Sequence, residues 1–79
     1  MAKKAPRGAT LDMGMEAAAR NLRVFGYPDA TAAMMREVYA AWLAGKRGRE
    51  LPHGVLGMMA EDQFEKNAKL LASLPDRQS

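Results

Sequence analysis

Apolar residues recur along the chain with the spacing of α-helices, and this spacing predicts three helices and no strand. The first helix is expected over about residues 11–25. Its buried stripe consists of Leu11, Met15, Ala18, Leu22 and Phe25. Thr10 or Asp12 can cap its N-terminus, because a side-chain oxygen there accepts a free backbone N–H. Gly26 can adopt the left-handed conformation that ends a helix, and Tyr27 would then fold back onto Leu22.

The second helix is expected over about residues 30–44, with Asp29 or Thr31 as its cap. Its apolar arc is wider than the stripe of an ordinary surface helix, which covers a little over 100°. The arc divides into two rows, one of Met34, Val38 and Trp42 and the other of Met35, Tyr39 and Leu43. A bundle needs only one row for its core, so we predict that the second row binds a partner. A bundle that wraps more tightly round this helix would instead bury both rows.

The third helix is expected over about residues 52–74, with Pro52 at the first helical position, where proline is favoured. One stripe keeps its register to the end, through Leu56, Ala60, Phe64, Asn67, Leu71 and Leu74. This regularity favours one long helix over two short ones. Gly57 lies on the apolar side, which predicts a close approach by another helix, such as the one that carries Trp42.

The size and composition of the chain set limits on its organisation. We expect one all-α domain, a small three-helix bundle over residues 10–75, between a disordered basic tail at 1–9 and a frayed tail at 76–79. The 79 residues include no cysteine, so helix packing, self-association or a partner must stabilise a small core. No apolar run approaches the ~20 residues of a membrane span, and no secretory signal opens the chain. We therefore expect a cytoplasmic protein without membrane contact.

The sequence offers little catalytic chemistry. His53 is the only histidine, cysteine is absent, and the only serines are Ser73 and Ser79 near the other end of the chain. Glu61 and Glu65 lie one helical turn apart, but no histidine or cysteine joins them at the spacing of metal ligands. We predict a surface role for His53, no enzymatic activity, and no metal, cofactor or small-molecule substrate.

The chain carries a net charge of +3, and its basic residues suggest a second class of function. They gather in two clusters, Lys3, Lys4 and Arg7 near the N-terminus and Lys46, Arg47 and Arg49 in a central loop. The stretch LAGKRGREL resembles the Gly-x-x-Gly loop of the KH family, with Gly45 and Gly48 as the glycines. This resemblance implies a loop that clamps a nucleic-acid backbone. KH domains also place strands around the two helices, and neither flank here has the pattern of a strand.

A helix-turn-helix explains the chain poorly, because the helix after the GYPD link offers only Arg36 for phosphate contacts. Two other hypotheses about function follow from these patterns. The leading hypothesis is a small protein-binding or self-associating module that uses the row Met35, Tyr39 and Leu43. Small helical chains of this kind are often encoded by phages or mobile elements and act on a host or virion protein. The alternative is a nucleic-acid-associated accessory protein that binds phosphates through the two basic clusters.

Overall fold

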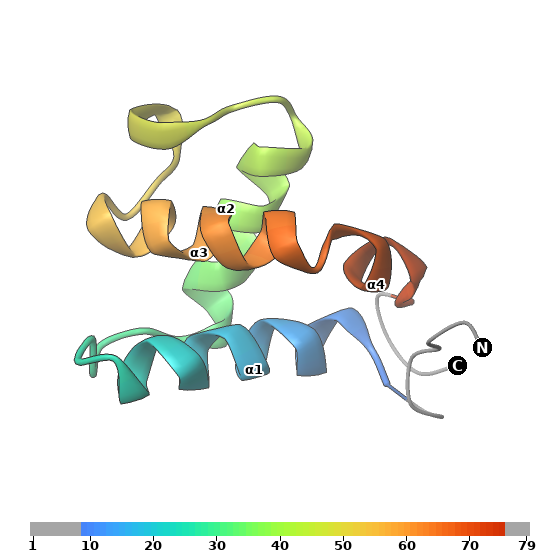
Figure 1. Cartoon of the computed structure of the whole chain (residues 1–79), viewed down its shortest axis with the longest axis horizontal. Coiled ribbons are helices and arrows are strands. Elements are labelled where there is room, and N and C mark those ends of the chain that lie inside the picture. Colours follow the sequence, from blue (N-terminus) through green and yellow to red (C-terminus); the bar gives the residue numbers. More distant parts are fainter. Residues whose placement is uncertain (1–8, 76–79) are drawn as a thin grey trace.

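The computed structural model describes residues 9–75, which form helices joined by short links (Figure 1). The elements in chain order are α1 (Leu11–Val24), α2 (Ala32–Leu43), the short 3-10 helix η1 (Gly48–Glu50), α3 (Val55–Lys66) and α4 (Ala68–Ser73). The second helix, α2, crosses the other two main helices and packs against both. No strand occurs between residues 9 and 75. The predicted all-α fold with three main helices is therefore confirmed.

Threonine caps begin both α1 and α2. The Oγ1 atom of Thr10 accepts a hydrogen bond from the backbone N–H of Met13 at 3.3 Å. In the same way, Oγ1 of Thr31 accepts from the N–H of Met34 at 3.2 Å. Each cap satisfies a backbone donor that the first turn leaves free and contributes about 1 kcal/mol. Of the two candidates predicted at each N-terminus, the threonine is the cap in both helices.

The same two helices end at glycines in the left-handed conformation, Gly26 with φ 105° and Gly45 with φ 98°. The residue after each glycine turns back on the helix: the N–H of Tyr27 donates to the carbonyl of Leu22 at 3.0 Å, and the N–H of Lys46 makes the equivalent bond at 3.1 Å. This pattern is the Schellman motif, which requires a positive φ and therefore favours glycine. The predicted return of Tyr27 to Leu22 is confirmed.

The start of α3 differs from the prediction, at Val55 instead of Pro52. His53 and Gly54 have φ values of 70° and 57°, which a right-handed helix does not allow. These residues form a turn before α3, and a hydrogen bond between His53 Nε2 and the carboxylate of Glu37 connects the turn to α2. His53 is exposed, as the sequence predicted, and it also has a specific contact with Glu37.

The single helix predicted for residues 52–74 is in fact two helices. At Asn67 the backbone has φ −116° and ψ 22°, which separates α3 from α4. The side-chain amide of Asn67 donates to the carbonyl of Gln63 at 2.9 Å, a local bond that competes with a regular helix. Phe64 and Leu71 remain buried on either side of the break. The apolar register is therefore kept although the helix is not.

The core lies around α2 and buries most of the predicted partner row, which was expected to be exposed. Met35 and Tyr39 are buried, and only Leu43 of that row is exposed, at 63%. The Tyr39 ring meets Phe64 edge-on with the centroids 5.1 Å apart, and burial raises the pKa of its phenol above the ordinary value. The physical reason is that α2 packs against α1 on one side and α3 on the other, so the core uses its wide arc. The alternative, in which the bundle buries the second row, holds for Met35 and Tyr39.

Two further packing predictions need correction. Phe25 is exposed, because α1 ends at Val24 and the residue after it takes the non-helical cap conformation. Gly57 is buried as predicted, but the group that approaches it is the backbone carbonyl of Pro52 in the turn before α3. The close approach therefore comes from a loop and not from the helix that carries Trp42.

Candidate protein-interaction surface

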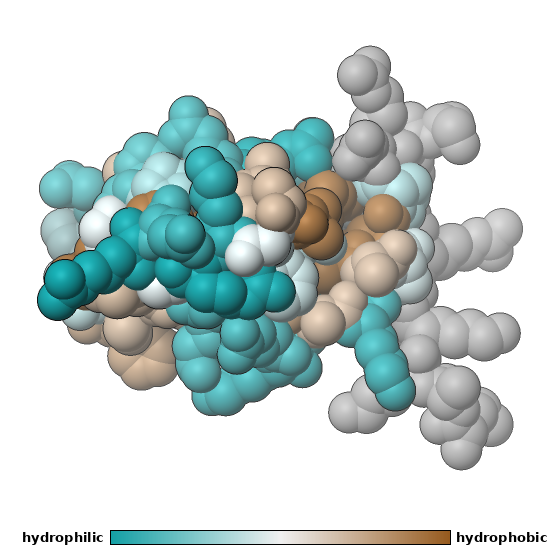
Figure 2. All heavy atoms as spheres, turned by 90° about the horizontal axis from the view of Figure 1, so that it is seen from above, coloured by the Kyte–Doolittle hydropathy of each residue, from teal (hydrophilic) through white to brown (hydrophobic). Residues whose placement is uncertain are grey.

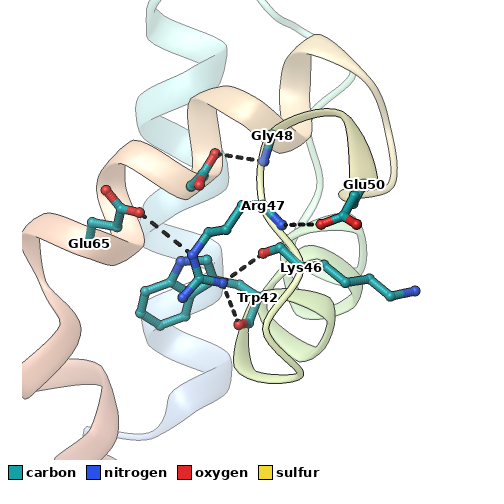
Figure 3. Close-up of polar contacts among 7 residues, drawn as sticks. Trp42, Lys46, Arg47, Gly48, Glu50 and Glu65 are labelled. Carbon is teal, nitrogen blue, oxygen red and sulfur yellow. Dashed lines mark hydrogen bonds and ion pairs between the residues drawn. The ribbon is translucent and has the colours of Figure 1, made fainter.

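The central basic loop makes hydrogen bonds and packing contacts within the protein. Of the basic residues predicted to bind nucleic acid, Lys3, Lys4 and Arg7 lie outside the described residues. Arg47 turns back over the protein (Figure 3). Its Nη1 donates to the carbonyls of Trp42 at 2.8 Å and Lys46 at 2.7 Å, and its guanidinium lies 4.8 Å from the centroid of a Trp42 ring. A guanidinium held in this way has fewer donors left for a phosphate.

Carboxylates occupy the backbone donors of the same loop. The N–H of Arg47 donates to Glu50 Oε1, and the N–H of Gly48 donates to Glu61 Oε1, both at 3.2 Å (Figure 3). Glu65 Oε2 lies 3.9 Å from Nε of Arg47. A Gly-x-x-Gly loop that clamps nucleic acid must offer its surface to the phosphate backbone. Here the protein's own carboxylates occupy two of its N–H groups, and the chain has no strand between residues 9 and 75.

The packing of Arg47 on Trp42 predicts a spectroscopic effect. Trp42 is the only tryptophan, so all tryptophan fluorescence comes from the indole that Arg47 covers. Replacing Arg47 with alanine uncovers the indole, so we expect red-shifted emission, stronger quenching by acrylamide and a stability loss of roughly 0.5–1 kcal/mol. Arg49→Ala, two positions along the same loop, should leave the emission unchanged. Equal emission from Arg47→Ala and the native protein would contradict the contact.

The candidate catalytic and metal-binding residues are engaged in structural contacts. Glu61 and Glu65 face the central loop, and His53 pairs with Glu37. The hydroxyl of Ser73 donates to a carbonyl of its own helix at 2.7 Å. Within residues 9–75, no three histidine, aspartate or glutamate side chains gather as a metal site would require. In the same part of the chain, no helix has both the length and the hydropathy needed to cross a membrane.

The exposed side of α1 carries a second apolar row. Met13, Ala17, Arg20 and Val24, which we call the outer row, follow one another at i, i+4, i+7 and i+11 and so lie on one side of the helix. Met13 is 57% exposed and Val24 is 80% exposed, whereas the opposite side of α1 packs into the core. The helix is thus apolar on two sides, of which the fold buries one.

A groove runs beside the outer row, between α1 and the pair α3 and α4. It has a volume of about 200 Å³, and the small residues Gly14, Ala17 and Ala18 line it on the α1 side. Leu70, on the α4 side of the groove, is exposed. Apolar side chains also reach the surface at the end of the molecule where α4 lies, as the brown spheres of Figure 2 show. This groove can accept side chains from a partner that lies along α1.

Charges line the opposite edge of the outer row. Glu16 pairs with Arg23 at 2.6 Å and lies 3.9 Å from Arg20, which follows it by four positions. Asp12 pairs with Arg36 of α2 at 3.0 Å. The acidic residues stand in the N-terminal half of α1 and the basic residues in its C-terminal half. An open hollow bordered by Asp12, Met13, Glu16, Ala17 and Arg20 lies on this side.

The outer row was not predicted from the sequence. A charged residue, Arg20, interrupts it, and the wide apolar arc of α2 led to a prediction of the partner surface on that helix instead. The signal was nevertheless present, because Met13 and Val24 fall outside the buried stripe of α1 and share one side of the helix. Searches of protein-family models, curated proteins and solved structures return no significant match that would assign a role to this surface.

Proposed function

We propose that the chain is a small, non-enzymatic protein-binding module whose contact surface is the outer row of α1 with the adjoining groove. The observation that supports this proposal is the exposure of Met13 and Val24 on a helix whose other side already fills the core. Helices that carry such a row bind into grooves or against other helices. Methionine adapts to irregular partner surfaces and is enriched in interface cores. The partner surface thus moves from α2, where the sequence placed it, to α1.

The nucleic-acid alternative has weaker support. In the central loop, the guanidinium of Arg47 is directed to carbonyls of its own chain. Only Lys46 and Arg49 of this loop are therefore left as candidates for phosphate contacts. The loop also lies beside Glu50, Glu61 and Glu65, which repel phosphate. The N-terminal cluster stays a prediction, since it falls outside the described residues.

A photo-crosslinking experiment tests the proposed surface. The chain has no cysteine, so a single cysteine can carry a photo-crosslinker at one chosen position. Ala17→Cys places the probe within the outer row, and Ala40→Cys, on the exposed side of α2, is the matched control. In the source cell, we expect protein crosslinks from position 17 that nuclease treatment does not change and that position 40 does not give.

Two outcomes would contradict the proposal. Equal crosslinking from both positions would place the contact surface elsewhere on the protein. Crosslinks that disappear after nuclease treatment would favour the nucleic-acid alternative.

A further inference from the structure

The outer row of α1 is complementary to itself when two copies run in opposite directions. We infer that its partner is a second copy of this chain, in an antiparallel α1–α1 pair about a two-fold axis that passes between Ala17 and Arg20. The inference rests on the proposed function of this surface. It follows from the order of residue types along the row, which reads apolar, small, basic and apolar from Met13 to Val24.

The antiparallel arrangement places apolar side chains opposite each other and a long side chain opposite a small one. Reversing the row places Met13 of one copy opposite Val24 of the other, so both exposed apolar side chains become covered. It also places Arg20 opposite Ala17, whose small side chain leaves room for the long arginine. The small side chain of Ala17 also permits a close approach of the two helices. A two-fold axis repeats each of these contacts, as in other closed dimers.

Charge favours the same orientation. Glu16 lies next to Ala17, so Arg20 of one copy comes within reach of the acidic half of the other copy's α1. The Arg20 side chain is 69% exposed and lies 3.9 Å from the Glu16 of its own chain, so it is free to turn toward a second copy. A parallel pair would instead bring Glu16 to Glu16 and Arg20 to Arg20. This complementarity distinguishes a second copy from an unrelated helical partner, which would not need it.

The size of the surface sets the expected strength of the dimer. The 14 residues of α1 span about 21 Å, and a helix pair of this length buries less than the ~800 Å² per partner of a standard interface. Leu70 at the far side of the groove extends the apolar area. We therefore expect a reversible dimer that dissociates in the micromolar range, so its detection requires a concentration series.

Sedimentation equilibrium of the full chain tests the dimer. From about 1 μM to 1 mM, the average mass should rise from that of one chain to that of two. Ala17→Arg places an arginine opposite Arg20 and should give a monomer at all these concentrations, with helicity unchanged. Ala40→Arg, on the exposed side of α2, should dimerise like the native chain. The inference would be overturned if the native chain stays monomeric to 1 mM, or if both variants weaken the dimer equally.

A short bismaleimide crosslinker tests the orientation. A mixture of Met13→Cys and Val24→Cys chains should give crosslinked dimers, whereas neither variant alone should do so. Self-crosslinking of Met13→Cys alone would show a parallel pair and overturn the antiparallel arrangement. A chain that remains monomeric but crosslinks other proteins through position 17 would overturn the second copy as partner and leave the proposed function standing. The absence of any protein crosslink from position 17 would reject both the dimer and the proposed function.

Discussion

Replacing Met35 with glutamate should unfold the protein, whereas the same replacement at Leu43 should leave it folded. Met35 is fully buried in α2 between α1 and α3, and a carboxylate there would have to lose its water without gaining a partner. Burying an unpaired charge costs several kcal/mol. The total stability of a 79-residue domain is roughly 4–12 kcal/mol, so this single change can remove most of it.

Leu43 provides a control of the same residue class in the same predicted row. Its side chain is 63% exposed near the C-terminus of α2, where a glutamate meets only the unfavourable end of the helix dipole, at about 0.3–1 kcal/mol. Circular dichroism at 222 nm should show a cooperative thermal transition for Leu43→Glu and little helix for Met35→Glu. A stable, helical Met35→Glu variant would mean that the row is a surface after all, as the sequence suggested.

The sequence predicts the helices well where their limits are set by neighbouring residues. Thr10 and Thr31 cap α1 and α2, and Gly26 and Gly45 end them, because caps and left-handed glycines act within one turn. The all-α fold was predicted from the helical spacing of the apolar residues. Local reasoning was wrong for the start of α3, because the positive φ of His53 depends on the turn that packs there and not on the residue type.

Periodicity alone hides the break between α3 and α4. Phe64 and Leu71 are seven positions apart, so they stay on one side of a continuous helix and remain buried across an interrupted one. The pattern cannot separate these cases, and Asn67, a residue that favours local hydrogen bonds, carried the only signal.

The candidate site was the hardest part to predict, because the exposure of a row depends on tertiary packing. The wide arc of α2 correctly indicated contacts on two sides, but width does not say whether the second contact lies within the chain or with a partner. In α1 the error was the opposite one: only the buried stripe was recognised, and the second apolar row was overlooked. Met13 and Val24 were not singled out in the sequence, although the fold leaves their side of α1 uncovered. Only the arrangement of α1, α3 and α4 shows that a groove accompanies the row.

The second large effect is expected at Gly57, where alanine should destabilise the protein. In an open helical position the change would stabilise it by about 1 kcal/mol, because glycine is a poor helix former. At Gly57 the backbone carbonyl of Pro52 stands where the new Cβ would lie. A carbonyl of the main chain cannot rotate away like a side chain, so the turn before α3 must move. We expect a loss of roughly 1–3 kcal/mol, which lowers the melting temperature by about 4–8 °C per kcal/mol.

Gly14→Ala is the matched control, since Gly14 is the only other glycine inside an α-helix in residues 9–75. A Cβ at Gly14 would lie 3.3 Å from the terminal methyl groups of Leu71 and Leu74, which can shift by small rotations. The gain in helix propensity should therefore remain, and thermal melts should show a Gly14→Ala variant at least as stable as the native chain. A Gly57→Ala variant with an equal or higher melting temperature would show that the turn does not rest on α3. Opposite signs at the two glycines would separate helix propensity from packing, because the substitution is identical and only the neighbouring atoms differ.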